Sequence, residues 1–193
     1  AEAFAREGAA VSICARGADG VERAVQALRG HGGTVHGAVC DLSDKEQIDS
    51  YIDDANEAIG GTNILVCNAS GFGRSDHAAA PLIAANGGGS IIHISTISAF
   101  GASKRTPPYA AVKAALNNYS LSQAAMLAKD NIRVNAVCPG SIYFEGGVWD
   151  LTKQNNRPLY DAIEASIPHG RYGVPEDVAD VVLFLASDMA RWV

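Results

Sequence analysis

A tyrosine and a lysine lie four positions apart in the segment YAAVKAAL, as Tyr109 and Lys113. On an α-helix, residues at i and i+4 lie one above the other on the same face, so the phenol and the ammonium can share one environment. Such a pair is suited to proton transfer, because a nearby ammonium stabilises a phenolate. The alternative is an amphipathic helix with a surface tyrosine and a lysine whose stem packs on apolar surface. The spacing alone does not distinguish the two.

Short apolar segments recur along the chain and could position this pair. Each is continuously apolar, which is typical of strands that are buried on both faces of a parallel sheet. We therefore predict five strands, at residues 10–15, 34–40, 63–67, 90–96 and 132–138.

Helical periodicity fills the intervals between these strands. The segment Ser43 to Glu46 fits a capping box that opens one helix, and Pro175 with two acidic residues opens another. Strands that alternate with helices predict a doubly wound α/β fold with a parallel, Rossmann-like sheet, in a single domain over residues 1–193. The predicted helices are residues 1–8, a stripe of Val21, Ala24, Val25 and Leu28, a stripe of Ile48, Ile52, Ala55 and Ile59, residues 109–129, and a stripe of Val178, Val181, Val182 and Leu185.

Composition excludes several classes of protein. The 193 residues are 48% hydrophobic with a formal net charge of -6, and no cluster of Lys or Arg predicts binding to nucleic acid or to an anionic membrane. No apolar run approaches the ~18 residues of a membrane span, so a cytoplasmic location is expected. The four cysteines and five histidines show no metal-ligand spacing. We expect reduced thiols and no metal site.

The motifs resemble those of the classical short-chain dehydrogenase/reductase family, and the resemblance spans nearly the whole chain. Each motif is weak alone, but six in the family's order make coincidence improbable. They are CDLSD (40–44), ILVCNASG (64–71), GGGSIIHIST (87–96), YAAVKAAL (109–116), IRVNAVCPGSI (132–142) and GRYGVPEDVADVVLFLAS (170–187).

The resemblance implies that Tyr109 exchanges a proton with a carbonyl or alcohol oxygen of the substrate while nicotinamide exchanges a hydride with its carbon. An unperturbed tyrosine has a pKa of about 10, poorly matched to neutral pH. The ammonium of Lys113, at roughly 4 Å and an effective dielectric constant of about 20, would stabilise the phenolate by about 4 kcal/mol. The family counterpart of Lys113 also hydrogen-bonds the nicotinamide ribose.

A hydroxyl completes the site in this family by orienting the substrate oxygen. Thr96 fits the strand register and lies at the family's distance from Tyr109. Ser98 instead fits a local S-x-x-G pattern with Gly101. Residues two apart share a face of a strand, so both could face the cleft. Thr96 is favoured, and the alternative of a threonine that merely ends a strand stays open.

At the adenosine end, Arg16 favours NADP(H) over NAD(H). Relatives that prefer NAD place an acidic side chain at the end of the second strand, where this chain has Ala15 followed by Arg16. A guanidinium can hold a 2′-phosphate through two hydrogen bonds. Asp41 and Leu42 are expected to bound the adenine pocket, although an aspartate before a capping serine is also ordinary turn chemistry.

The nicotinamide end follows the family pattern with two departures. Ser70 replaces the glycine of the N-A-G motif, and Phe144 stands where many relatives have a threonine that bonds the cofactor. The remaining contacts implied by the resemblance are Asn68, Ala69, Tyr109, Lys113, Pro139, Gly140 and the backbone of Ile142.

The segment YFEGGVWD, residues 143–150, is expected to form a mobile lid over the substrate. Tyr143, Phe144 and Trp149 are candidate apolar walls, which would suit an apolar or acyl substrate. The alternative is that these aromatic rings cover the core or a contact between subunits.

Three family segments have no counterpart in the sequence. They are the first strand with its T-G-x-x-x-G-x-G turn, the helix that carries a catalytic asparagine after the N-A-G motif, and the last strand. We expect absent segments before Ala1, near residues 73–78, where part of a crossover helix is missing, and beyond Val193.

These features together predict an NADP(H)-dependent oxidoreductase that interconverts a ketone and a secondary alcohol and that resembles 3-oxoacyl reductases. The family implies a homotetramer or homodimer, with a small-molecule substrate. One alternative is a non-catalytic member of the family that binds a nucleotide. The other is an NAD-linked alcohol dehydrogenase.

Overall fold

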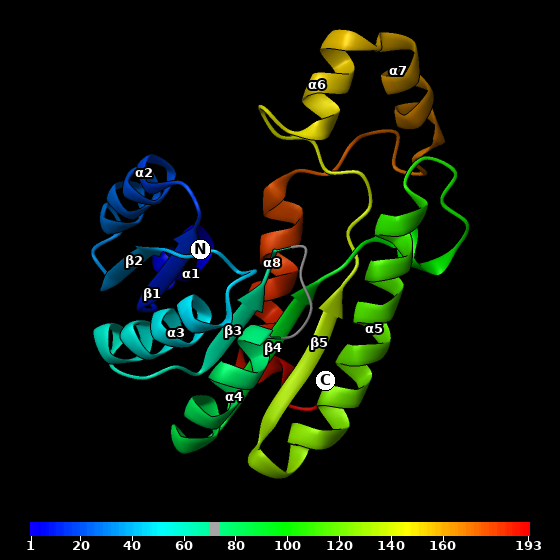
Figure 1. Ribbon diagram of the computed structural model, residues 1–193. Helices are drawn as coiled ribbons and strands as arrows, with labels where there is room; N and C mark the ends of the chain where they lie inside the picture. Colours follow the sequence, from blue (N-terminus) through cyan, green and yellow to red (C-terminus); the bar gives the residue numbers. More distant parts are fainter. Residues whose placement is uncertain (70–73) are drawn as a thin grey trace.

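A computed structural model of the chain describes residues 1–69 and 74–193 (Figure 1). Its strands begin and end within two residues of the predicted segments. They are β1 (Val11–Ala15), β2 (Val35–Val39), β3 (Ile64–Cys67), β4 (Gly89–Ile94) and β5 (Ile132–Val137).

The strands form two parallel sheets. β1 pairs with β2, and β4 lies between β3 and β5. In the doubly wound strand order 3-2-1-4-5-6, the first strand lies between the second and the fourth. The strand expected ahead of Ala1 would take that place, between β1 and β3, and it stays a prediction.

Helices connect the strands as expected for a doubly wound domain. The crossover from β3 to β4 contains a three-turn helix despite Pro81 within it. The helices are α1 (Glu2–Arg6), α2 (Ala18–Arg29), α3 (Lys45–Ile59), α4 (Arg74–Ala85), α5 (Pro107–Leu127), α6 (Val148–Asn155), α7 (Arg157–Ser166) and α8 (Pro175–Ala186), with short 3₁₀ segments at Ile97–Phe100, Ala128–Asp130 and Asp188–Ala190.

Helices cover both faces of the three-stranded sheet, with α4 and α5 on one face and α8 on the other (Figure 1). Adjacent residues of β4 show this directly. Ile91 packs with Ile83 of α4, whereas Ile92 packs with Val182 and Leu185 of α8, because successive side chains of a strand point to opposite faces. The cluster around Ile91 also contains Ile48 of α3, which joins the two sheets in one core.

Three local expectations are wrong. The first residue of the capping box is not Ser43: Asp44 is the N-cap of α3, and its carboxylate accepts from the backbone N–H groups of Glu46 and Gln47. Val181 of the α8 stripe is exposed. Burial on both faces holds for most of β4 but not for the other strands, because β4 alone has a neighbour on each side in the described three-stranded sheet.

The four cysteines are free thiols, as predicted, although only Cys40 is fully buried. Among the helices of the described ranges, none combines the length and the apolar character that crossing a bilayer requires.

The start of β4 requires glycine because two backbones approach it closely. A Cβ on Gly89 would lie 1.8 Å from the carbonyl oxygen of Asn63, at the beginning of β3. A Cβ on Gly88, which has φ +102°, would lie 2.3 Å from the carbonyl oxygen of Asn131. The GGGS segment therefore lets β4 enter between its two neighbours.

Gly89→Ala is expected to destabilise the protein by about 3 kcal/mol or more, because the new methyl group can be accommodated only by moving a backbone. Gly20→Ala is the matched control: it lies in α2 with open space around its Cβ position, and alanine is a better helix former. Chemical denaturation of both variants checks this. An unchanged unfolding midpoint for Gly89→Ala would contradict the close approach.

Candidate active site

Functional candidates follow the ends of the strands. Within each sheet the strands are parallel, so the segments that follow them leave from the same edge. Arg16 follows β1, Asp41 follows β2, Asn68 follows β3, Thr96 follows β4 and Pro139 follows β5. Open α/β sheets bind ligands outside the carboxyl ends of their strands. α6 and α7 extend beyond this edge of β3, β4 and β5 (Figure 1).

Tyr109 and Lys113 lie on one face of α5, in its first two turns. The Nζ atom of Lys113 is 6.0 Å from the centre of the Tyr109 ring. Lys113 is only 3% exposed, whereas Tyr109 is 43% exposed. A buried ammonium thus lies next to a phenol that solvent, or a ligand, can reach. This is the shared environment that the spacing predicts.

The end of β4 holds the ammonium in place. Nζ of Lys113 donates a hydrogen bond of 2.6 Å to the carbonyl oxygen of Ile94. Burial lowers the pKa of Lys113, and the neighbouring thiols of Cys138 and Cys67 oppose this shift. An ammonium has three donors, so Lys113 retains donors for a ligand hydroxyl after bonding Ile94.

The two candidate hydroxyls lie beyond the strand. β4 ends at Ile94, so Thr96 and Ser98 do not share a strand face, and that part of the reasoning is wrong. Thr96 instead caps the 3₁₀ segment Ile97–Phe100, with its Oγ1 accepting from the backbone N–H of Ser98 at 3.3 Å. Thr96 and Ser98 are both partly exposed. The Thr96 hydroxyl keeps its own hydrogen for donation.

Ser95 is a positioning residue that the sequence did not indicate. It is buried, and its Oγ donates to the backbone carbonyl of Lys113 at 3.2 Å. Two residues later, the backbone N–H of Ile97 donates to the carbonyl oxygen of Pro139 at 3.0 Å. These two bonds fix the segment after β4 against both α5 and the turn after β5.

At the adenosine end, Arg16 and Asp41 lie close enough to interact. The pKa of Asp41 is lowered, chiefly by hydrogen bonds from the backbone and hydroxyl of Ser43, and also by the charge of Arg16. The turn chemistry weighed as an alternative is therefore present, because Oδ1 of Asp41 accepts both bonds from Ser43. Arg16 and Leu42 are exposed at the same edge.

At the nicotinamide end, the turn after β5 is held by the segment before α8. Ile142 and Gly173 form a parallel β-bridge, with Gly173 N–H donating to Ser141 and Tyr143 N–H donating to Gly173. A Cβ on Gly173 would lie 2.6 Å from Cδ1 of Ile142, so the GRYG motif provides room for Ile142. Pro139 is partly buried, and Gly140 is exposed.

Asn68 and Ala69 are exposed directly after β3, and their contact with a cofactor stays a prediction. Ser70, which replaces the family glycine, lies outside the described residues. We expect residues to be missing near positions 73–78, and position 73 also lies outside the described residues. Residues 74–78 of that segment are helical in α4.

The segment expected to form the lid, residues 143–150, leads into the helical pair of α6 and α7, and this lid region has its own aromatic core. The rings of Tyr160 and Tyr172 stack at 4.5 Å, and Trp149 lies 5.2 Å from Tyr172. Tyr143 contacts Tyr160 edge-on and donates from its hydroxyl to Asp150 at 2.8 Å. Tyr143 and Trp149 therefore pack partly within the lid, whereas Phe144 is 52% exposed. The buried Tyr160 and Tyr172 were not indicated by the sequence.

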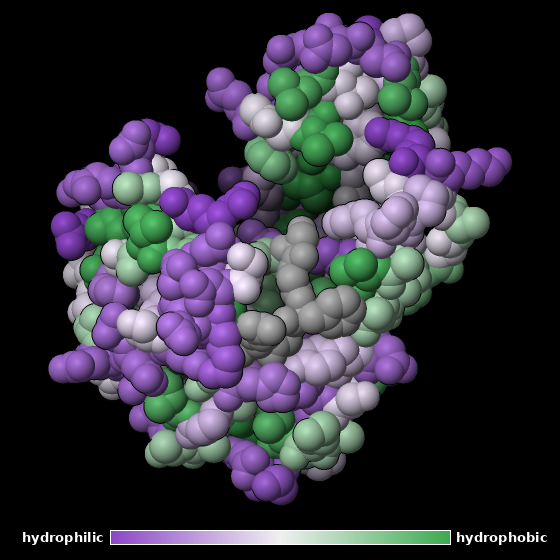
Figure 2. Space-filling model, in the orientation of Figure 1, coloured by the Kyte–Doolittle hydropathy of each residue, from purple (hydrophilic) through white to green (hydrophobic). Residues whose placement is uncertain are grey.

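The lid also contacts the loop before α5. The guanidinium of Arg105 lies 5.1 Å above the Trp149 ring, in a cation–π contact. Figure 2 shows the surface hollowed between the lid and the sheet, with hydrophobic side chains on the lid side of the hollow. Arg105 lies shortly before Tyr109 in the sequence. Its contact with Trp149 therefore connects the lid to the segment that carries the phenol.

This edge fits a dinucleotide at both ends. Arg16 and Leu42 are exposed at one end, and Lys113 and the Pro139 turn lie at the other. The printed sequence contains no T-G-x-x-x-G-x-G turn for the phosphates. The residues present therefore offer contacts to the adenosine and nicotinamide ends of a dinucleotide but not to its pyrophosphate.

Family models match the whole chain in two overlapping parts. The model described as "short chain dehydrogenase" matches residues 1–78. The model described as "Enoyl-(Acyl carrier protein) reductase" matches residues 67–193.

Curated relatives match along nearly the full chain. A 3alpha-hydroxysteroid dehydrogenase of Mediterraneibacter gnavus is 34% identical over 217 positions, covering 98% of this chain and 84% of its own. Dehydrogenase/reductase SDR family member 4 of Homo sapiens is 31% identical over 220 positions, covering 100% of this chain and 77% of its own. The latter alignment is longer than the 193 residues, so the human protein has residues at 27 or more positions where this chain has none.

Solved structures match closely in fold. L-sorbose reductase from Gluconobacter frateurii, complexed with NADPH and L-sorbose, has a TM-score of 0.89 at 30% identity and covers 99% of this chain and 85% of its own. A 7 alpha-hydroxysteroid dehydrogenase complexed with NADH and 7-oxo glycochenodeoxycholic acid has a TM-score of 0.90 at 29% identity, covering 100% of this chain and 83% of its own.

Proposed function

The chain belongs to the short-chain dehydrogenase/reductase family and is an NAD(P)-dependent oxidoreductase, and we propose that it interconverts a ketone and a secondary alcohol with Tyr109 as general acid and base. One observation carries this assignment. The accessible phenol of Tyr109 lies beside the buried ammonium of Lys113 at the carboxyl edge of the sheet. That arrangement supplies a proton to a developing alkoxide and stabilises the phenolate left behind.

The steps follow from the positions of the side chains. A nicotinamide dinucleotide, when bound, would supply or accept the hydride. Tyr109 donates its proton to the carbonyl oxygen during reduction and takes it back during oxidation. The hydrogen bond to the carbonyl of Ile94 helps to hold the ammonium of Lys113 beside the Tyr109 ring. Thr96, the favoured orienting group, donates its hydroxyl hydrogen to the same substrate oxygen, and the lid of α6 and α7 excludes water.

For the cofactor we propose NADP(H). Support comes from Arg16, which is exposed where a 2′-phosphate would lie and has no ion pair within 4 Å in the described part of the chain. Asp41, whose carboxylate interacts with Arg16, could accept from a ribose hydroxyl, but one of its oxygens already accepts from Ser43. The solved relatives use both cofactors, NADPH in L-sorbose reductase and NADH in the hydroxysteroid dehydrogenase.

For the substrate we propose an apolar or acyl ketone, such as a 3-oxoacyl group. The lid region supports this class, because Phe144 is exposed and hydrophobic side chains lie on the lid side of the hollow (Figure 2). For the assembly we propose a homotetramer or homodimer through α5, whose Leu121 and Met126 are exposed large hydrophobic residues.

Tyr109→Phe is expected to lower kcat about 100- to 10,000-fold with little change in stability, because it removes only the transferable proton. Tyr51→Phe is the matched control, since Tyr51 lies on α3 and bonds Ser12. Oxidation of NADPH with a panel of ketones measures the effect. Wild-type protein that binds NADPH but reduces no ketone would instead indicate the non-catalytic member of the family.

Thr96→Val and Ser98→Ala distinguish the two candidate hydroxyls. If Thr96 orients the substrate oxygen, its loss lowers kcat/KM by roughly 10- to 100-fold, the effect of one hydrogen bond to a charged oxygen. Ser98→Ala then stays near wild type, because its backbone N–H, which Thr96 accepts from, is retained. The reverse ranking would transfer the role to Ser98.

Arg16→Ala is expected to raise KM for NADPH by roughly 10- to 100-fold and to leave KM for NADH nearly unchanged, because only the 2′-phosphate needs the guanidinium. Arg23→Ala serves as control, since Arg23 is exposed on α2. Equal KM changes for both cofactors, or a wild-type preference for NADH, would favour the NAD-linked alcohol dehydrogenase.

A further inference from the structure

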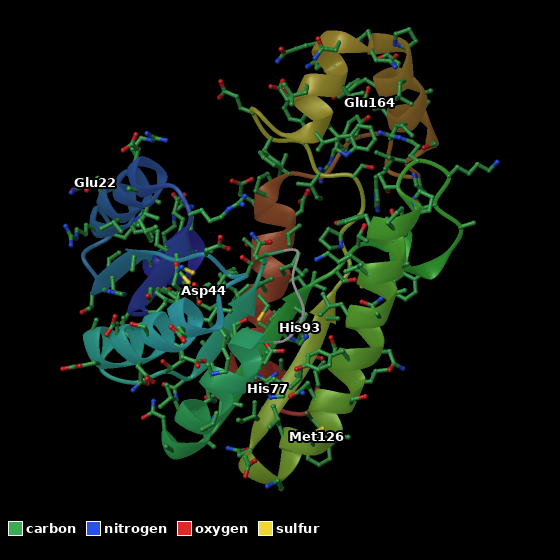
Figure 3. The ribbon with its side chains drawn as sticks, in the orientation of Figure 1. Glu22, Asp44, His77, His93, Met126 and Glu164 are labelled. Atoms are coloured by element: carbon green, nitrogen blue, oxygen red, sulfur yellow. The ribbon has the colours of Figure 1, made fainter. Side chains whose placement is uncertain are left out.

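A buried polar cluster lies between β3, β4, α4 and α5, and none of its members takes part in the proposed reaction. Asp76 and His93 are each 1% exposed, although both carry ionisable groups. Nε2 of His93 is 2.9 Å from Oδ2 of Asp76, and Sγ of Cys67 is 2.9 Å from Oδ1 of the same carboxylate. The hydroxyl of Tyr119 also bonds Asp76. Figure 3 labels His93 in the interior of the domain.

The second ring nitrogen of His93 is fixed by Ser120. Oγ of Ser120 lies 2.8 Å from Nδ1 of His93 and 2.8 Å from the carbonyl oxygen of Leu116. A hydroxyl has one hydrogen, and the carbonyl can only accept, so Ser120 donates to Leu116 and accepts from Nδ1–H. The lone pair of a neutral His93 ring would then point at Asp76.

This arrangement requires a cation between His93 and Asp76. A ring lone pair and a carboxylate oxygen at 2.9 Å repel each other unless a proton or a metal ion lies between them. The thiol of Cys67 adds a third group that gives up its proton to a metal. The three ligand atoms, Sγ of Cys67, a carboxylate oxygen of Asp76 and Nε2 of His93, all lie within 4.8 Å of one another.

We propose that Cys67, Asp76 and His93 form a binding site for Zn²⁺. Zinc takes sulfur, imidazole nitrogen and carboxylate oxygen at about 2.0–2.3 Å, which places tetrahedral ligand atoms roughly 3.3–3.8 Å apart. The present separations of 2.9 to at most 4.8 Å bracket that range, so small side-chain shifts suffice. The hydroxyl of Tyr119, which already bonds Asp76, is a candidate for the fourth position.

Charge balance supports the exchange of protons for zinc. Without metal, the one proton between His93 and Asp76 and the thiol proton of Cys67 leave the cluster with no net charge. With Zn²⁺, the proton between His93 and Asp76 and the thiol proton leave, and two positive charges replace them. The buried site is therefore neutral in both states, which avoids the cost of a net charge in the core.

The hydrogen bond from His93 to Ser120 also matches the design of zinc sites. Metal-binding histidines usually donate their other N–H to an oxygen, which fixes the ring and its tautomer. The sequence spacing did not predict this site, because its ligands come from β3, α4 and β4, at positions 67, 76 and 93. Zinc here would fasten the beginning of α4 to the ends of both strands.

Cobalt titration of the chelator-treated, full-length protein tests the proposal. Co²⁺ should bind one to one and give a thiolate-to-cobalt charge-transfer band that Zn²⁺ then abolishes by displacement. Cys67→Ser should remove the band and weaken metal binding about 100-fold or more, and Ser120→Ala should weaken it by roughly 10- to 100-fold. Asp76→Asn is a second, nearly isosteric ligand variant.

Two matched controls keep the test specific. Cys138→Ser removes a partly buried thiol whose hydrogen-bond partner is Asn117, and His77→Asn removes an exposed imidazole on α4 that Figure 3 also labels. Both should bind Co²⁺ as the wild type does. Thermal unfolding in chelator shows that each variant is folded. The proposal fails if no saturable binding occurs, or if Cys67→Ser keeps the band while Cys138→Ser or His77→Asn loses it.

Discussion

A buried ammonium constrains the whole catalytic edge of this protein. Lys113 has almost no contact with solvent, and an ammonium removed from water is destabilising unless polar groups replace its hydration. The carbonyl of Ile94 provides such a group, and Ser95 bonds the backbone of Lys113 in return. α5 is thereby fixed to the end of β4. Tyr109, one turn earlier on α5, takes its position from the same attachment.

The remaining parts of the edge are joined to this point by backbone contacts. Ile97 bonds Pro139, which connects the segment after β4 to the turn after β5. Ile142 bridges to Gly173, which connects that turn to the segment before α8. Arg105 lies over Trp149 and joins the lid to the loop before α5. The groups that we propose to act together on one substrate are therefore positioned by main-chain bonds and by one cation–π contact.

Behind the edge, the buried groups of Cys67, Asp76 and His93 hydrogen-bond one another. Asp76 accepts from Cys67, Tyr119 and His93, and these bonds lower its pKa against the opposing effect of its burial. The pKa of Cys67 is raised well above its usual range by burial and by the charge of Asp76. Without a metal, Cys67 is therefore a neutral hydrogen-bond donor. The zinc proposal keeps the same balance with a different cation.

The sequence by itself determined the features that depend on neighbours along the chain. Continuously apolar segments located the five strands of the described residues within two residues, and the spacing of Tyr109 and Lys113 placed them on one helix face. Only the tertiary structure decided which face of each helix and strand is buried and that β4 ends before Thr96. It also decided that Gly89 must lack a side chain and that Cys67 lies close to His93. The physical reason is distance along the chain: these contacts join segments that approach each other only after the strands have paired, and local propensity carries no information about that pairing.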